Sequence, residues 1–130
     1  MEEGPKPRIH LPREEAIRRG IESEERIERV VLQGIESKTL PVWIIGIRKS
    51  SVKENKEGID AWLDTDAGPV ELQIKSSKKE AQVGRKQARE KGVLRAVIRV
   101  NPRMSDDELR EEFIVITGRI RNQLLGQNLE

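Results

Sequence analysis

A polar helical segment lies between the third and fourth strands that the sequence predicts, and its position constrains the fold more than any other feature. The segment runs from Lys78 to Lys91 and is followed by Gly92, a residue that typically ends a helix. Strand patterns lie on either side of it, at 70–76 and 93–100. A helix between two strands predicts an α/β fold with a parallel or mixed sheet and helices on both faces.

Apolar periodicity predicts the remaining elements. The expected order is αβββαβα, with residues 50–58 forming a loop or a twisted hairpin. At the start of the last helix, Ser105 to Glu108 matches a capping box. In the first helix, Gly34 is a predicted C-cap and Gly20 a point where the helix could divide. The predicted elements are helices at 12–34, 78–91 and 105–125, and strands at 40–49, 59–63, 70–76 and 93–100.

The chain is expected to contain one domain, from residue 12 to residue 130, preceded by an arm. Residues 1–11 are predicted to be loosely attached, because Pro5, Pro7 and Pro12 disfavour an early helix. The remaining length is sufficient for one hydrophobic core without disulfides.

The amino-acid composition limits the kinds of catalytic and metal site that the chain can form. The chain has no cysteine and a single histidine, which excludes thiolate zinc sites, a cysteine nucleophile and a multi-histidine metal centre. Any catalytic metal is therefore expected to be Mg or Mn, bound by oxygen ligands. No apolar run reaches membrane-spanning length and no signal peptide is recognisable, so we expect no membrane contact and a cytoplasmic location.

Two predicted strands carry a group of polar residues that could perform phosphodiester chemistry. Pairing of 59–63 with 70–76 across a short turn would bring Asp60 close to Gln73 and Lys75. Phosphodiester hydrolysis needs a divalent cation and a positive charge near the scissile phosphate. Asp60 could bind the metal, Gln73 could add its side-chain carbonyl, and Lys75 could supply the charge and orient the attacking water.

These residues resemble the PD-(D/E)xK nuclease superfamily. Gly-Ile-Asp60 followed by Gln73-Ile-Lys75-Ser-Ser is similar to the variant in which glutamine replaces the acidic residue, as in Holliday-junction-resolvase-type and Mrr-like members. The resemblance covers about residues 13–100. It implies a three-layer restriction-endonuclease-like core, αβββαβ with a mixed sheet, to which the C-terminal helix is added.

The family usually carries an acidic metal ligand on its first helix. Gly20-Ile-Glu-Ser-Glu24-Glu-Arg resembles that motif, so Glu24 is the expected ligand, with Glu28 as the alternative one turn on. The resemblance implies a Mg- or Mn-dependent endonuclease that acts on nucleic acid, with DNA favoured over RNA. The alternative is an inactive module with the same fold that binds nucleic acid or a protein.

Two further surfaces are candidates for binding. The segment after the motif is rich in basic and hydroxyl side chains, which either contact phosphates or form an ordinary solvated helix face. The last helix is more apolar than a surface helix needs, and a homodimer would cover its apolar side chains. The candidate nucleic-acid contacts are Ser76, Ser77, Lys78, Lys79, Arg85 and Lys86, and the apolar residues of the last helix are 113–116, Ile120 and Leu124.

Overall fold

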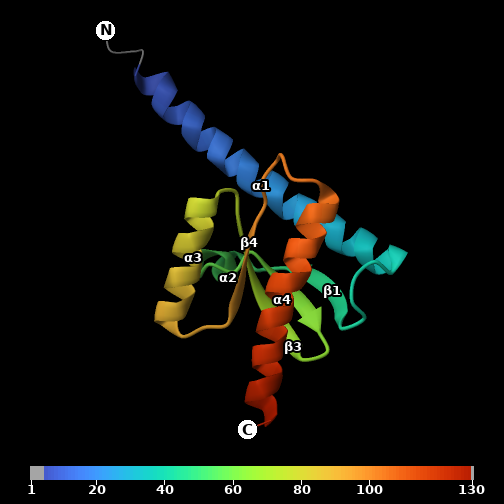
Figure 1. The fold of residues 1–130 in the computed structure, drawn as a ribbon. Coiled ribbons are helices and arrows are strands. Elements are labelled where there is room, and N and C mark those ends of the chain that lie inside the picture. The colour runs from blue at the N-terminus through green and yellow to red at the C-terminus, as the bar shows by residue number, and fades with distance from the viewer. Residues whose placement is uncertain (1–4, 130) are drawn as a thin grey trace.

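The computed structural model describes residues 5–129, with side chains described for 13–126, and contains one four-stranded mixed sheet with helices on both faces (Figure 1). The order αβ(α)ββαβα confirms the predicted α/β class. The elements are α1 (Pro5–Ser37), β1 (Ile44–Lys49), α2 (Val52–Lys56), β2 (Ala61–Thr65), β3 (Gly68–Lys75), α3 (Lys78–Lys91), β4 (Arg95–Arg99) and α4 (Asp106–Leu129).

The strands lie in the order β1-β2-β3-β4. The first three form an antiparallel meander, and β4 lies parallel to β3. The pairing of Ala61 with Leu72 fixes the register of β2 and β3, so the two strands of the motif are neighbours as predicted. The crossover from β3 to β4 is α3, which Ser77 caps at its start and Gly92 ends in the left-handed conformation, φ 71°.

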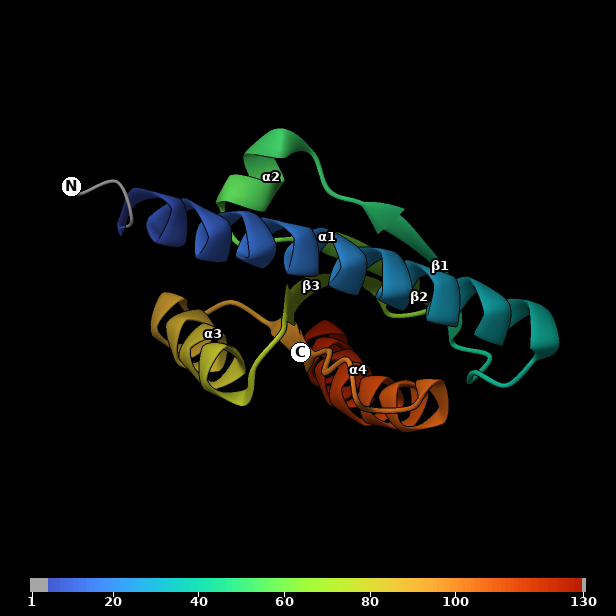
Figure 2. The same ribbon diagram turned by 90° about the horizontal axis from the view of Figure 1, so that it is seen from above.

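Alternation along the strands divides the sheet into two faces. One face carries Leu63, Leu72 and Ile98, which form the core together with α1 and α4. The other face carries Gln73 and Val97, which pack against Gly84 of α3. Figure 2 shows α1 crossing one side of the molecule, with α3 and α4 below it and apart from each other. The fold therefore has three layers, with α1 and α4 on one face of the sheet and α3 on the other.

The first helix begins earlier than the prolines predict. It starts at Pro5 and continues without a break through Gly20 (Figure 1). Pro5 and Pro7 lie in its first turn, where backbone N–H groups have no partner within the helix and proline is tolerated. The expected start at Pro12 was wrong, because the helix accepts the loss of one internal hydrogen bond there.

Two local predictions were also wrong. Gly34 does not end α1. It lies under the buried Leu40 side chain, and a Cβ at 34 would stand only 2.6 Å from Leu40 Cγ. Residues 52–56 form the short helix α2 in place of a loop, because Ser51 and Glu54 make a reciprocal capping box.

Within residues 5–129, no helix combines the length and the apolarity that a membrane crossing requires.

Candidate functional site

Asp60 lies immediately before β2, where the chain enters the sheet beside β3. Its backbone N–H donates to Leu72 O at 2.8 Å, and its carboxylate Oδ2 accepts from Ile74 N at 2.7 Å. The side-chain carboxylate therefore accepts a β3 backbone hydrogen bond that a backbone carbonyl would accept if β2 began earlier. The two bonds hold Asp60 against the stretch of β3 that contains Gln73 and Lys75.

The turn after α2 determines where Asp60 stands. Gly58 has φ 98°, a conformation that disfavours any side chain, and its N–H donates to Asn55 O at 3.0 Å. The Asn55 side-chain amide in turn donates to Asp60 Oδ1 at 3.4 Å. The short helix α2 therefore supplies both the turn and a neutral neighbour for the carboxylate.

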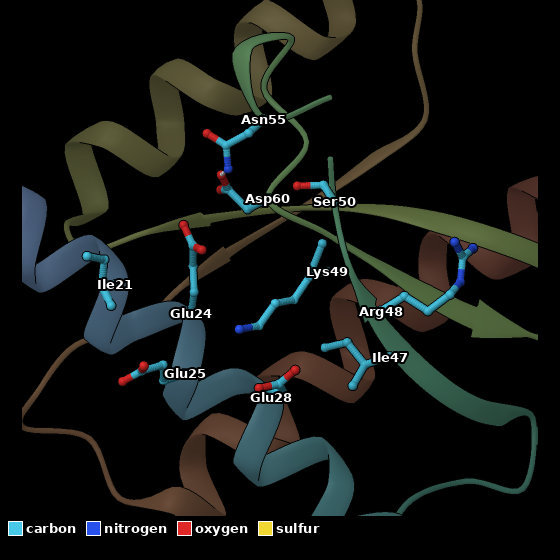
Figure 3. A pocket seen from close by; sticks show the side chains of 11 residues that line it. Ile21, Glu24, Glu25, Glu28, Ile47, Arg48, Lys49, Ser50, Asn55 and Asp60 are labelled. Carbon is cyan, nitrogen blue, oxygen red and sulfur yellow. Dashed lines mark hydrogen bonds between the residues drawn. The ribbon is translucent and has the colours of Figure 1, made fainter. Parts of the chain in front are cut away.

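A cleft of about 250 Å³ separates α1 from β1 and the start of β2. Figure 3 shows the Glu24 carboxylate of α1 pointing across this cleft toward Asp60, with Asn55 beside Asp60 and Lys49 reaching in from the end of β1. The structure thus brings together two carboxylates that are 36 residues apart in sequence and come from different elements.

The two carboxylates share an unusual electrostatic environment. Burial raises the pKa of Asp60, although its hydrogen bond from Ile74 and the charges of Lys75 and Arg95 partly oppose the effect. Burial also raises the pKa of Glu24, the negative charge of Asp60 raises it further, and Lys49 opposes both. Ionising either carboxyl group in this cleft therefore costs free energy, and a nearby cation would offset that cost.

The structure separates the two acidic residues of α1 that the sequence left as alternatives. Both Glu24 and Glu28 line the cleft. In Figure 3, Glu24 points to Asp60, whereas Glu28 lies one turn farther along α1. Because the charge of Asp60 acts on the pKa of Glu24, Glu24 is the helix acid nearer to the aspartate.

Gln73 does not line the cleft. Its side chain is 6% exposed and lies under α3, where a Cβ at Gly84 would stand 2.5 Å from its Oε1. Within the described residues Oε1 has no hydrogen-bond partner, while Nε2 and Arg95 Nη1 both lie close to Gly58. A half-turn of the carboxamide would present Oε1 to the Arg95 guanidinium, which is a donor. Gln73 therefore lies on the α3 side of the sheet, with its carboxamide near the turn at Gly58 that Arg95 also approaches.

Lys75 lies on the other side of α1 from the cleft. It lines a groove of about 650 Å³ between α1 and α3, together with Arg19, Ser76 and Lys79. Its charge nevertheless lowers the pKa of Asp60, so the two side chains are close enough to interact electrostatically. The middle of α1 therefore lies between the carboxylate cleft and this basic groove.

The basic residues predicted to contact nucleic acid point in different directions. Ser76 and Lys79 line the groove beside α1, whereas Lys78 and Arg85 line a hollow that faces α4. Lys86 is exposed. Ser77 accepts a hydrogen bond from Glu80 N at 3.1 Å and so caps α3, while Ser76 donates to the Glu80 carboxylate at 3.3 Å.

The donor set of the cleft fits a hard divalent cation in part. Glu24 and Asp60 offer carboxylate oxygens from two elements, which Mg²⁺ and Mn²⁺ prefer. Across residues 13–126, no three Asp, Glu or His side chains gather as a ligand set. The Gln73 oxygen would have to leave its buried position to join them. The cleft therefore contains two of the three side chains that the sequence predicts as metal ligands.

Sequence reasoning missed Lys49, Ser50 and Asn55, which line the cleft beside Asp60. A signal was available, since Ser51-Val-Lys-Glu54 is a capping-box pattern and predicts a helix that would carry Asn55. Nothing in the sequence indicated that Lys49 would reach α1.

Comparison of the whole chain with models of protein families, with curated proteins and with solved structures returned no match. The link to the PD-(D/E)xK nucleases remains a resemblance of motif and element order.

Proposed function

We propose that this chain is a Mg²⁺- or Mn²⁺-dependent nuclease that hydrolyses phosphodiester bonds in DNA. The observation that carries the proposal is the pair of partly buried carboxylates, Glu24 and Asp60, that face each other across one cleft. A bound divalent cation would supply Lewis acidity to a phosphoryl oxygen and acidify water. Such a cation also offsets the cost of keeping both carboxylates ionised in a partly buried site.

The residues around the pair have separate roles in this proposal. Glu24 and Asp60 hold the cation, and the bond from Ile74 N keeps Asp60 in place. Lys75 stabilises negative charge that develops on the phosphate. Its ammonium group is close enough to lower the pKa of Asp60, so it lies within electrostatic reach of the site. Lys49, on the cleft side, is a second cation at the pair.

The groove between α1 and α3 is the proposed path of the substrate backbone. Arg19, Lys75 and Lys79 line it, and Glu80 is the only acidic residue among its described lining residues. Phosphate contacts of this kind bind DNA without regard to sequence and weaken as salt rises. Lys75 lines this groove and its charge acts on Asp60, so a bound strand would lie within electrostatic reach of the candidate site.

The proposal is tested by incubating the full chain with labelled DNA and Mg²⁺ or Mn²⁺. Cleavage is expected with the wild type and not with Asp60→Asn, whereas Glu25→Gln, which changes an exposed residue of the same cleft, should cleave normally. Cleavage by Asp60→Asn at the wild-type rate would contradict the proposal.

A second candidate is an inactive nuclease-fold module that binds nucleic acid or a protein partner. The buried carboxamide of Gln73 favours it, because a neutral side chain occupies the position where an acidic ligand is usual in the resembled family. The two candidates differ in one outcome. DNA binding that is independent of divalent cations, with no cleavage, would support the inactive module.

A further inference from the structure

The groove between α3 and α4 lies away from the carboxylate cleft and takes no part in the proposed chemistry. It has a volume of about 610 Å³ and follows β4, the strand at one end of the sheet order. Most of its lining side chains are aliphatic or basic. The aliphatic residues are Ala88, Val93, Leu94, Val97, Val115, Ile116 and Ile120, the basic ones are Arg85, Arg89, Arg95 and Arg119, and the others are Glu112 and Gln123.

The side chains that α4 contributes to the groove are arranged so that they could pair with a second, antiparallel copy of the same helix. Glu112 and Arg119 both line the groove and lie seven residues apart, which places them two turns apart on nearly the same face of the helix. Between them lie Val115, which is 52% exposed, and the half-buried Ile116. Among the described residues, neither Glu112 nor Arg119 has an ion-pair partner.

We propose that this groove is a homodimer interface, in which α4 packs antiparallel against α4 of a second copy. A two-fold axis between Val115 and Ile116 would place Glu112 of each copy opposite Arg119 of the other. The two apolar residues would meet at the centre. The stripe formed by Glu112, Val115, Ile116 and Arg119 is thus complementary to itself. The contact between Glu112 and Arg119 would form twice in the dimer.

Charges flanking the stripe agree with this occupant. Glu108 and Glu111 lie exposed on the first half of α4, and Arg85 and Arg89 lie on the α3 side of the groove. The two-fold axis would place Glu111 and Glu108 of the second copy opposite Ile120 and Gln123, at the end of the groove that Arg119 lines. A nucleic-acid strand is less well matched, because no aromatic side chain for base stacking lines the groove among the described residues.

Sedimentation of the full chain at physiological salt and several concentrations tests the proposal. The wild type is expected to form a dimer of twice the 14.9 kDa chain mass. Arg119→Glu and Glu112→Arg should each weaken the dimer about tenfold or more, because each places like charges opposite one another twice. The double variant Glu112→Arg, Arg119→Glu restores opposite charges at both contacts and should restore the dimer.

Thermal unfolding followed by circular dichroism would show that the variants remain folded. Lys53→Glu, an exposed charge reversal on α2, is the matched control and should leave the dimer unchanged. A wild type that is monomeric at every concentration overturns the proposal. So does a dimer that both single reversals leave intact, or a double variant that is folded but monomeric. Binding of a DNA duplex or an acidic peptide to a monomer, lost in Arg119→Glu, would instead assign the groove to that ligand.

Discussion

The Glu24 carboxylate on α1 faces the Asp60 carboxylate at the start of β2, and the charge of Asp60 raises the pKa of Glu24. Two acidic groups held together in a partly buried cleft are unfavourable for the fold by themselves. Such an arrangement is typical of functional sites, where acidic groups serve to bind a ligand and do not stabilise the fold.

The raised pKa values predict how neutral substitutions change stability with pH. Between the ordinary carboxylate pKa, about 4, and the raised value, the native state holds more protons than the unfolded chain, so stability is lost as pH rises through that range. Asp60→Asn and Glu24→Gln should therefore be more stable than the wild type at neutral pH, and the gain should vanish in acid. Urea unfolding at neutral and acidic pH measures the difference. Variants that are less stable than the wild type at neutral pH would contradict the pKa directions.

Two glycines of α1 provide a matched test of packing. Gly34→Ala should destabilise the protein, because its Cβ would lie 2.6 Å from the buried Leu40 Cγ. Overpacking of this kind costs about 1–3 kcal/mol, more than the gain of about 1 kcal/mol from alanine in a helix. Gly20→Ala, with no atom within 4 Å of its Cβ, should stabilise by up to about 1 kcal/mol. Chemical denaturation of both variants would show opposite signs, and equal signs would contradict this packing.

The ion pair between Arg95 and Glu71 supports the turn that precedes Asp60. The side chain of Arg95 is 5% exposed, bonds Glu71 Oε1 at 2.9 Å and reaches Glu57 O at 3.4 Å. Glu71→Gln should cost about 3 kcal/mol, because it leaves a buried guanidinium without its counter-charge. Denaturant unfolding measures the loss. A double variant, Glu71→Gln with Arg95→Met, should lose less than the sum of the single changes, and strict additivity would show that the pair does not couple.

Lys75 provides the most specific test of the charge near the phosphate. Lys75→Met should lower the rate of DNA cleavage about a hundredfold or more, because a charge that stabilises the transition state would be lost. Lys86→Met changes an exposed lysine on α3 and should leave the rate within a few-fold. Single-turnover cleavage at saturating protein separates this loss from weaker DNA binding. Equal rates for the two variants would remove Lys75 from the mechanism.

Much of the fold could be predicted, because it depends on local patterns. The bounds of α3, the capping box of α4 and the pairing of β2 with β3 follow from caps, periodicity and a short turn. Gly34 was misinterpreted, since its role depends on Leu40, which packs against it only in the tertiary structure. The start of α1 was also missed, because the position of a proline within the first turn, rather than its presence, decides whether a helix forms.

The candidate site was predictable only in part. Alternation correctly brought Asp60 beside β3, and the resemblance of Gly20-Ile-Glu-Ser-Glu24 to a family motif indicated Glu24. Alternation placed Gln73 on the face opposite Leu72, but it did not show that α3 covers that face or that Gly84 leaves room for the carboxamide. Lys49 and Asn55 reach the cleft through the packing of α1 and α2, which the sequence pattern does not specify.

The most direct test of the central claim is calorimetric titration of the full chain with Mn²⁺. The account predicts saturable binding at one site in the wild type and in Glu25→Gln, with loss of that binding in both Glu24→Gln and Asp60→Asn. A wild type that releases no heat of binding, or variants at 24 and 60 that bind Mn²⁺ as the wild type does, would contradict it.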